Sequence, residues 1–273
     1  MGYKQRLNRA FEDAPVLPVN ENTRYILMSD CHRGTGTTYD TFMKNRHLFL
    51  AAMQYYYRRG YHYIELGDGD ELWENRKLSR IRQCHEDCDM WWKRFLRQDR
   101  AHSIYGNHDI SFRSVAPEAL VLKSADEEIV IGLVHGHQGD FWNSSLWPLS
   151  AFLVRYVWKP LERLGMSDPT QASKNYRKSG RIERRLENWA KANRITLICG
   201  HTHRARLPNE SLQGIDTEGI PLKDLKGEYL NTGSCVHPYG IMGIELNGYR
   251  ACLVKWRLAV QEDGRLYVER VIV

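Results

Sequence analysis

The chain has 273 residues, which is enough to bury a substantial core in one large domain or in one domain with an insertion. It is 42% hydrophobic and 26% charged and contains no repeat or low-complexity tract, so the composition is that of a soluble globular protein. Its longest apolar stretches are strand-length and fall short of the roughly 20 residues that a membrane-spanning helix needs.

Residues 1–22 are polar and lack the apolar centre of a secretory signal, and we interpret them as an extension of a domain over 23–273. Without an export signal, the six cysteines are expected to be reduced thiols in a cytoplasm. Cys84 and Cys88 are one helical turn apart and could form a small metal site. A CxxxC pattern without a distant partner pair is, however, more typical of two ordinary helix positions.

The net charge of +6 is unevenly distributed. Residues 151–194 carry eleven basic and four acidic side chains, so the excess in this segment alone is larger than that of the whole chain. Such a concentration predicts an anionic partner, which could be a phosphate group, a nucleic acid or a lipid head group.

The first half of the chain alternates apolar runs of strand length with helical patterns. Three of the runs end in side chains that bind metals, with 25–28 before Asp30 and His32, 61–66 before Asp68, and 102–105 before Asn107. Between the runs, 42–57 and 78–96 have the apolar spacing of helices. Strands with polar carboxyl ends that alternate with helices predict a layered α/β fold.

The second half repeats this pattern twice and then changes. A run at 129–134 precedes His135, and a run at 197–199 precedes Gly200, His201 and His203. Beyond a loop-like stretch at 206–228, short alternating segments predict an antiparallel portion that forms a second sheet packed on the first.

The segment 138–194 matches neither sheet, and we interpret it as an inserted helical cap. A second helix at about 175–192 is strongly basic, and Pro160 should divide the first. The first helix carries an apolar stripe at helical spacing, made of Leu149, Phe152, Leu153, Tyr156, Val157, Leu161 and Leu164. This stripe favours packing against the main body, since amphipathic helices usually face a core, and a peripheral contact with the inner membrane face is the alternative.

Each polar cluster has an ordinary explanation on its own, such as a helix cap, a turn or a satisfied buried histidine. Together they supply oxygen and nitrogen donors that suit Mn²⁺, Fe or Zn²⁺. Seven ligands are too many for one ion and suit two, with one carboxylate as a bridge, at a separation of about 3.5–4 Å. The sequence therefore predicts two divalent ions, with Mn²⁺ as the first choice.

In chain order the clusters are DxH, GD, GNHD, HGH and GHTH, and this ordered set, over about residues 25–256, resembles the calcineurin-like metallophosphoesterases. The resemblance implies a four-layer αββα sandwich, in which two mixed sheets are flanked by helices, with a binuclear centre. It assigns one metal to Asp30, His32, Asp68 and His203. It assigns the other metal to Asp68, Asn107, His135 and His201, so that Asp68 is the bridge.

The resemblance also implies hydrolysis of a phosphodiester or pyrophosphate bond. Two cations acidify a bridging water, so that hydroxide can attack phosphorus in line, and they stabilise charge on the phosphoryl oxygens. His108 is expected to act on the leaving oxygen or the transition state, and Asp109 to orient His108.

The stretch "GDGDELW" fits the pattern GDxxExW, with Glu71 and Trp73 in place. With the helical insert, it resembles the UDP-2,3-diacylglucosamine pyrophosphatases, although "GNHD" and "HGH" depart from the GNRD and HGD that are usual there. The expected substrate is a phosphate-containing small molecule, either nucleotide-linked or a lipid precursor. The candidate substrate-binding residues are Arg33, Arg177, Arg181 and Arg184.

Two other functions stay open. One is a nucleic-acid phosphodiesterase that uses the basic cap, whose affinity would fall steeply with salt. The other is a non-catalytic scaffold that binds proteins, which the complete ligand set disfavours.

Overall fold

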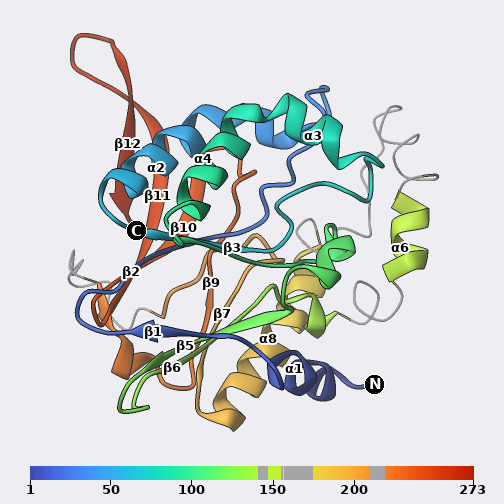
Figure 1. Cartoon of the computed structure of the whole chain (residues 1–273), viewed down its shortest axis with the longest axis vertical. Coiled ribbons are helices and arrows are strands. Elements are labelled where there is room, and N and C mark those ends of the chain that lie inside the picture. The colour runs from blue at the N-terminus through green and yellow to red at the C-terminus, as the bar shows by residue number, and fades with distance from the viewer. Residues whose placement is uncertain (141–146, 155, 157–174, 209–218) are drawn as a thin grey trace.

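The structure, a computed structural model, describes residues 1–140, 147–154, 156, 175–208 and 219–273. Two mixed β-sheets pack face to face, and helices cover the outer face of each sheet (Figure 1). The predicted α/β sandwich of two mixed sheets flanked by helices is thus confirmed.

The first sheet has the strand order β1-β5-β6-β7-β9. All its neighbours are parallel except β5 and β6, which are antiparallel. Its strands are β1 (Val16–Val19), β5 (Ala119–Ser124), β6 (Val130–Val134), β7 (Thr196–Cys199) and β9 (Tyr229–Asn231).

The second sheet has the order β12-β11-β10-β2-β3-β4, and β8 pairs with β11. Strands β2, β3 and β4 are parallel, whereas β10, β11 and β12 are antiparallel to their neighbours. The bounds are β2 (Arg24–Met28), β3 (His62–Leu66), β4 (Ala101–Ile104), β8 (Ile220–Pro221), β10 (Ile241–Asn247), β11 (Arg250–Val260) and β12 (Leu266–Ile272).

The helices form the two outer layers. Helices α1 (Tyr3–Phe11) and α8 (Tyr176–Asn193) pack on the first sheet, and α2 (Arg46–Arg58) and α4 (Glu86–Leu96) pack on the second. The remaining described helices are α3 (Leu78–Cys84), α6 (Trp147–Leu153) and the short 3₁₀ turns η1 (Thr41–Lys44), η2 (Ile110–Ser114), η3 (His137–Gly139) and η6 (Leu222–Leu225).

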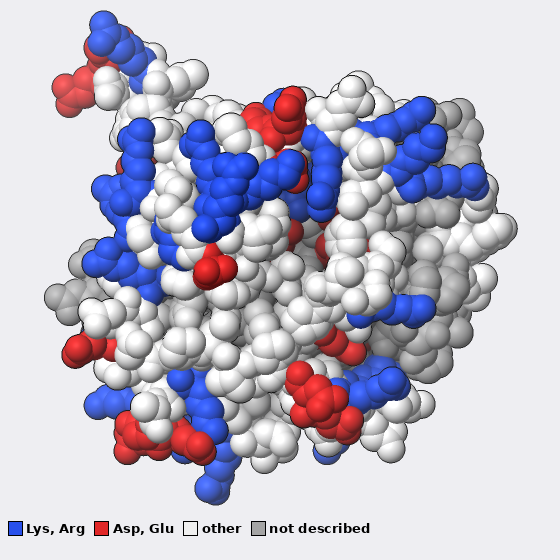
Figure 2. Space-filling view, in the orientation of Figure 1, with Lys and Arg blue, Asp and Glu red and all other residues white. Residues whose placement is uncertain are grey.

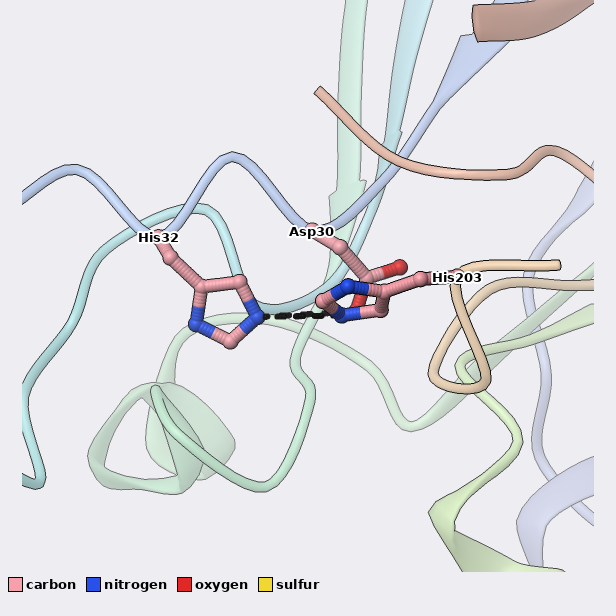
Figure 3. Close-up of side chains that lie close together, drawn as sticks. All are labelled: Asp30, His32 and His203. Atoms are coloured by element: carbon pink, nitrogen blue, oxygen red, sulfur yellow. Dashed lines mark hydrogen bonds and ion pairs between the residues drawn. The ribbon is translucent and has the colours of Figure 1, made fainter. Parts of the chain in front are cut away.

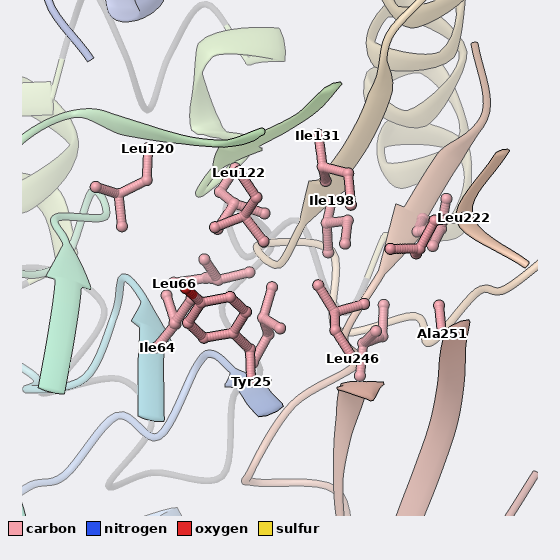
Figure 4. Close-up of a cluster of buried hydrophobic side chains, with 14 of the residues drawn as sticks. Tyr25, Ile64, Leu66, Leu120, Leu122, Ile131, Ile198, Leu222, Leu246 and Ala251 are labelled. Carbon is pink, nitrogen blue, oxygen red and sulfur yellow. The ribbon is translucent and has the colours of Figure 1, made fainter. Parts of the chain in front are cut away.

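Strand periodicity explains why the molecule has layers. In β2, Tyr25 and Leu27 face the first sheet, whereas Ile26 and Met28 face the helices α2 and α4. The core between the sheets is formed by branched and aromatic side chains from both, such as Ile64 of β3 and Ile198 of β7 (Figure 4). The two sheets therefore dock through one continuous apolar layer, which fixes the strand ends of one sheet against those of the other.

The amino-terminal residues 1–22, expected to be an extension outside the domain, belong to it. Strand β1 pairs with β5 in the first sheet, and Leu7 and Ala10 of α1 are buried against α8 and the sheet. Only a few apolar residues form this contact, which is why the segment has the composition of a polar tail.

The predicted cap at 138–194 is described only in part. Its basic helix, expected at 175–192, is α8, and α8 buries Ile182, Leu186 and Trp189 in the same core as the first sheet. It is therefore part of the outer helical layer and not separate from both sheets. The boundaries of an insert remain a prediction, because 141–146, 155 and 157–174 lie outside the described residues.

The apolar stripe of the cap was expected to pack against the main body, but its described residues are largely exposed. Ala151 and Val154 pack against Trp73, whereas Leu149, Phe152 and Tyr156 are exposed. Val157, Leu161 and Leu164 lie outside the described residues. No helix among the described residues is long and apolar enough to cross a membrane.

Candidate metal centre

The seven predicted metal ligands follow strands of both sheets. In the second sheet, Asp30 and His32 follow β2, Asp68 follows β3 and Asn107 follows β4. In the first sheet, His135 follows β6, and His201 and His203 follow β7. Because β2, β3 and β4 are parallel, and β6 and β7 are parallel, the ligands of each sheet leave it at one edge.

Asp30, His32 and His203 form a first group of potential ligand atoms (Figure 3). His203 Nε2 lies 3.1 Å from Asp30 Oδ1 and 3.4 Å from His32 Nε2, and His32 Nε2 lies 3.7 Å from Asp30 Oδ1. Two ligands that bind one ion at about 2.1 Å lie about 3.0–3.6 Å apart, depending on the angle between them. The separations within the group are close to those of ligands on one ion.

Asp68, His135 and His201 form a second group, and all three side chains are buried. His135 Nε2 lies 3.1 Å from Asp68 Oδ2, which also lies 3.9 Å from His32 Nε2. Asp68 therefore lies between the two groups, as a bridging carboxylate must. His108, the residue after Asn107, donates its backbone N–H to Asp68 Oδ1 at 2.8 Å. This hydrogen bond holds the Asn107 loop beside Asp68.

Several buried polar atoms at this centre make no hydrogen bond within the described part of the protein. Among the described residues, no hydrogen bond reaches Asp30 Oδ1, either amide atom of Asn107, or Nε2 of His135 and of His201, although all are buried. A buried polar group without a hydrogen bond costs about 1–3 kcal/mol, so folded proteins rarely leave several together. Carboxylate, amide and imidazole atoms that converge in this way fit divalent cations.

The backbone at the centre is also unusual. Eight described residues other than glycine have a positive φ, and five of them are predicted ligands: Asp30, His32, Asp68, His201 and His203. Such a conformation costs on the order of 1–3 kcal/mol in each residue and persists at functional sites, where the surrounding structure enforces it. The strain is concentrated on the residues that would hold metal.

The alternation of residues in "GHTHR" has a structural cause. His201 and His203 face the ligand groups, whereas Thr202 and Arg204 face α8 and donate hydrogen bonds to Glu183, each at 3.0 Å. At Gly200 an added Cβ would collide with Ser29 and Asp30. Glycine is therefore required for the loop to bring its histidines to Asp30.

His108 lies beside the centre, but its partner differs from the expected one. Its Nδ1 lies 2.8 Å from Oε1 of Glu71, and its ring stacks on Trp73 with centroids 4.2 Å apart. Asp109 instead accepts the backbone N–H groups of Gly69 and Gly106, at 2.8 and 2.6 Å. Asp109 thus ties together the loops of Asp68 and Asn107, and we assign the orientation of His108 to Glu71.

Opposing charges set the protonation of these groups. Burial would lower the pKa of His32, but contacts with Asp30 and Glu71 raise it well above its ordinary value. Burial opposes a charge on His135 too, yet Asp68 raises its pKa to about 9. For Asp109, burial and the charge of Asp68 raise the pKa to about 7. The carboxylates thus favour the protonated forms of His32 and His135, and metal binding would displace these protons.

Two residues near the centre were given no role from the sequence. Glu71 is in the GDxxExW pattern, which was the available signal. Asp140 Oδ2 lies 4.0 Å from His201 Nε2 and 2.8 Å from Lys178 Nζ of α8. Nothing in the local sequence distinguishes Asp140 from a loop residue.

The predicted substrate-binding arginines have two different environments. Arg33 is largely buried. Its guanidinium donates to Glu65 of β3 at 2.9 and 3.0 Å and to Asp70 at 2.9 Å, so it links the loop after β2 to β3 and to the loop after β3. Three others are exposed on α8, on the side opposite its buried face: Arg177, Arg181 and Arg184.

Basic side chains are not confined to α8. On the face that Figure 2 shows, Lys and Arg also gather in the upper part of the view, where α2 and α4 lie in Figure 1. The exposed basic residues of these two helices and their ends are Arg58, Arg59, Lys93, Arg94 and Arg97. Positive charge alone therefore does not single out the predicted cap as the substrate surface.

No family model matches the chain, and no curated protein matches it. Solved structures that match include Vps29 of Chaetomium thermophilum, at 12% identity over 92% of this chain and 95% of that chain, with a TM-score of 0.40. The same protein complexed with the cyclic peptide RT-D3 matches at 12% identity, with the same coverage and a TM-score of 0.38. The calcineurin-like phosphoesterase YfkN of Bacillus subtilis matches at 11% identity over 92% and 90% of the two chains, with a TM-score of 0.38. At these identities and scores, the function has to be inferred from the chain's own geometry.

Proposed function

We propose that this chain is a binuclear, metal-dependent hydrolase of phosphodiester or pyrophosphate bonds, of the calcineurin-like metallophosphoesterase kind. The observation that carries the proposal is the convergence, from both sheets, of seven metal-binding side chains, of which four have buried atoms without a hydrogen bond in the described part of the protein and five are on strained backbone. A scaffold that only binds proteins is the alternative, and it would show no metal-dependent turnover.

Two sites share Asp68. Asp30, His32 and His203 would hold the first ion with Asp68, and Asn107, His135 and His201 would hold the second with Asp68. Two divalent cations, with Mn²⁺ as the first choice and Fe or Zn²⁺ as alternatives, would supply an acidified water as the nucleophile and neutralise charge on the phosphoryl oxygens.

The chain's own residues perform the remaining steps. His108 lies beside the centre, with its ring 4.7 Å from that of His32, and is outside the ligand set, so its Nε2 can give a proton to the leaving oxygen. Glu71 holds the other ring nitrogen, and the packing of Trp73 fixes the plane of the ring. Asp109, through Gly69 and Gly106, keeps the loops of Asp68 and Asn107 at a fixed separation.

The finer part of the proposal is the substrate. A nucleotide-linked or lipid-precursor small molecule would place its reacting phosphate on the metals and a second phosphate near the exposed arginines of α8, whose positive charge would attract it. Steep loss of affinity with added salt would instead favour a nucleic-acid substrate.

The test is to measure metal content and turnover together. Purified wild-type chain should bind about two Mn²⁺ and hydrolyse at least one member of a panel of phosphomonoesters, phosphodiesters and nucleotide-diphospho-sugars. Asp68→Ala should lose both metal and turnover, because Asp68 contacts both groups. Asp224→Ala, which removes an exposed carboxylate from η6, is the matched control and should lose neither. A fully active, fully metallated Asp68→Ala protein would refute the binuclear centre.

A further inference from the structure

Glu71 lies between two histidine rings that the proposed function gives different roles. Its carboxylate is 2.8 Å from Nδ1 of His32 and 2.8 Å from Nδ1 of His108, and its residue is only 7% exposed. The two rings are nearly perpendicular, with centroids 4.7 Å apart. One buried side chain thus contacts the same ring atom of a predicted ligand and of a predicted acid.

The chemistry of the carboxylate determines where each ring carries its proton. An ionised carboxylate only accepts hydrogen bonds, so Nδ1 of each ring must be the donor. The Nε2 of His32 is then the ring atom left for a metal, whose binding would displace the proton there, and this atom points to His203 and Asp30 in the first group. The Nε2 of His108 is left as the ring atom that can exchange a proton with substrate.

His32, Glu71 and His108 could also be considered as a third set of metal ligands, since their atoms lie close together. The distances argue against this. Two ligands at about 2.1 Å from one ion lie about 3.4 Å apart at a tetrahedral angle, whereas both Nδ1 atoms are 2.8 Å from Glu71. A separation of 2.8 Å is that of a charge-assisted N–H···O hydrogen bond.

We propose that Glu71 is a positioning residue that fixes the tautomer and orientation of His32 and His108 together. It rests on the proposed function, since His32 acts there as a ligand and His108 as an acid. One carboxylate then sets the geometry of the first metal site and that of the leaving-group proton. The second metal site, which contains neither ring, does not depend on Glu71.

The informative substitution is Glu71→Gln, which keeps the size of the side chain. A glutamine is uncharged and has an N–H group in place of one carboxylate oxygen, so the hydrogen bonds to the two rings lose their charge assistance and one of their acceptor atoms. We expect one of the two bound Mn²⁺ ions to weaken by about 10–100-fold, as is usual when a group that orients a metal ligand is removed, with the other unchanged. The matched control is Glu187→Gln on α8, whose carboxylate pairs with Lys191 and Arg206 and contacts neither ring.

Turnover gives a second readout. In Glu71→Gln, measured at saturating Mn²⁺, kcat should fall more for phosphodiesters with poor leaving groups than for those with good ones, because only the former need the proton of His108. KM for a small aryl phosphodiester should change little. A loss that is equal for all leaving groups would place Glu71 in the support of the fold alone.

A third readout does not depend on activity. In ¹⁵N-labelled full chain supplied with Zn²⁺ in place of Mn²⁺, NMR should show both rings as Nδ1–H donors in hydrogen bonds. At least one of these signals should disappear in Glu71→Gln and none in Glu187→Gln. The outcomes separate the two proposals. If the wild type binds two metals, and Glu71→Gln has the same metal affinity, leaving-group dependence and ring signals, the positioning role is overturned and the proposed function stands. If the wild type binds no metal, the proposed function fails. In that case, ring signals that are the same in the wild type and in Glu71→Gln would also overturn the role of Glu71.

Discussion

The loop that carries His201 and His203 is anchored to α8 by one side chain, and Glu183→Ala tests that anchor. Glu183 accepts from Thr202, which is fully buried, and from Arg204. Leaving the buried hydroxyl of Thr202 without an acceptor costs about 1–3 kcal/mol. The pair with Arg204, a residue whose side chain is 39% exposed, adds less than about 1 kcal/mol.

The two contributions together predict a destabilisation of about 1–4 kcal/mol. At about 2–4 °C for each kcal/mol in a chain of this size, the midpoint of thermal unfolding should fall by roughly 2–16 °C. Circular dichroism measures this midpoint, and a Mn²⁺ titration of the same protein should show weaker binding, because both histidines lose their fixed support.

Two further variants separate the anchor from a general effect on α8. Glu183→Gln keeps an acceptor for Thr202, so its midpoint should lie between those of the wild type and Glu183→Ala. Arg181→Ala, on the exposed face of the same helix, should not change the midpoint. If Glu183→Ala and Arg181→Ala melt at the same temperature, the reasoning from the Thr202 hydrogen bond is refuted.

Three other predictions concern the acid, a buried carboxylate and the basic helix. His108→Ala should keep both metals and lose about 10²–10⁴-fold in turnover, least for good leaving groups, and unchanged turnover across the substrate panel would remove His108 from the mechanism. Burial opposes ionisation of Asp40, but hydrogen bonds from His85 and the Gly36 backbone hold its pKa below its ordinary value, so its contribution to stability is present at neutral pH and is lost as the pH falls below about 4. The difference in urea midpoint between wild type and Asp40→Asn should therefore shrink from pH 7 to pH 3, and a constant difference would contradict it. The last prediction neutralises the three exposed arginines of α8, Arg177, Arg181 and Arg184. The KM for the large substrate should rise, and hydrolysis of a small aryl phosphodiester should not change. Equal losses of activity for both substrates, or no loss for either, would mean that this positive charge is only solvated.

The strands that carry the ligands could be predicted because their signal is local. A short apolar run followed by Gly and by Asp, Asn or His is visible in the letters, and β2, β3, β4, β6 and β7 lie where these runs predicted them. The pairing of strands is not local. Tyr229–Asn231 was grouped with the strands that follow it, yet β9 pairs with β7 in the first sheet, and β10 joins β2 in the second. Packing between distant segments decides these partners.

The contacts at the centre show the same limit. The ligand set follows from the motifs, but the partner of His108 depends on a side chain 37 residues away, and sequence adjacency favoured Asp109. The backbone of the GDGD loop turns Glu71 toward both histidines, and no pattern of residue types predicts that direction. The cap arginines likewise cannot be assigned to substrate from their charge, since α2 and α4 also expose basic residues.

The contacts between Asp140 and α8 have a consequence for how the protein can vary. Lys178 pairs with Asp140, and Arg185 donates to the carbonyl of Gly139, so the chain returns in α8 to the place that it left after η3. Because these two ends are held together by α8, which is anchored in the core, the length of chain between 140 and 175 does not determine where His135 or His201 lies. Doubling the length of such a loop costs only about 0.6 kcal/mol of closure entropy. Evolution or an engineer can therefore exchange this segment without moving these two histidines, provided that the contact of Ala151 and Val154 with Trp73 is kept.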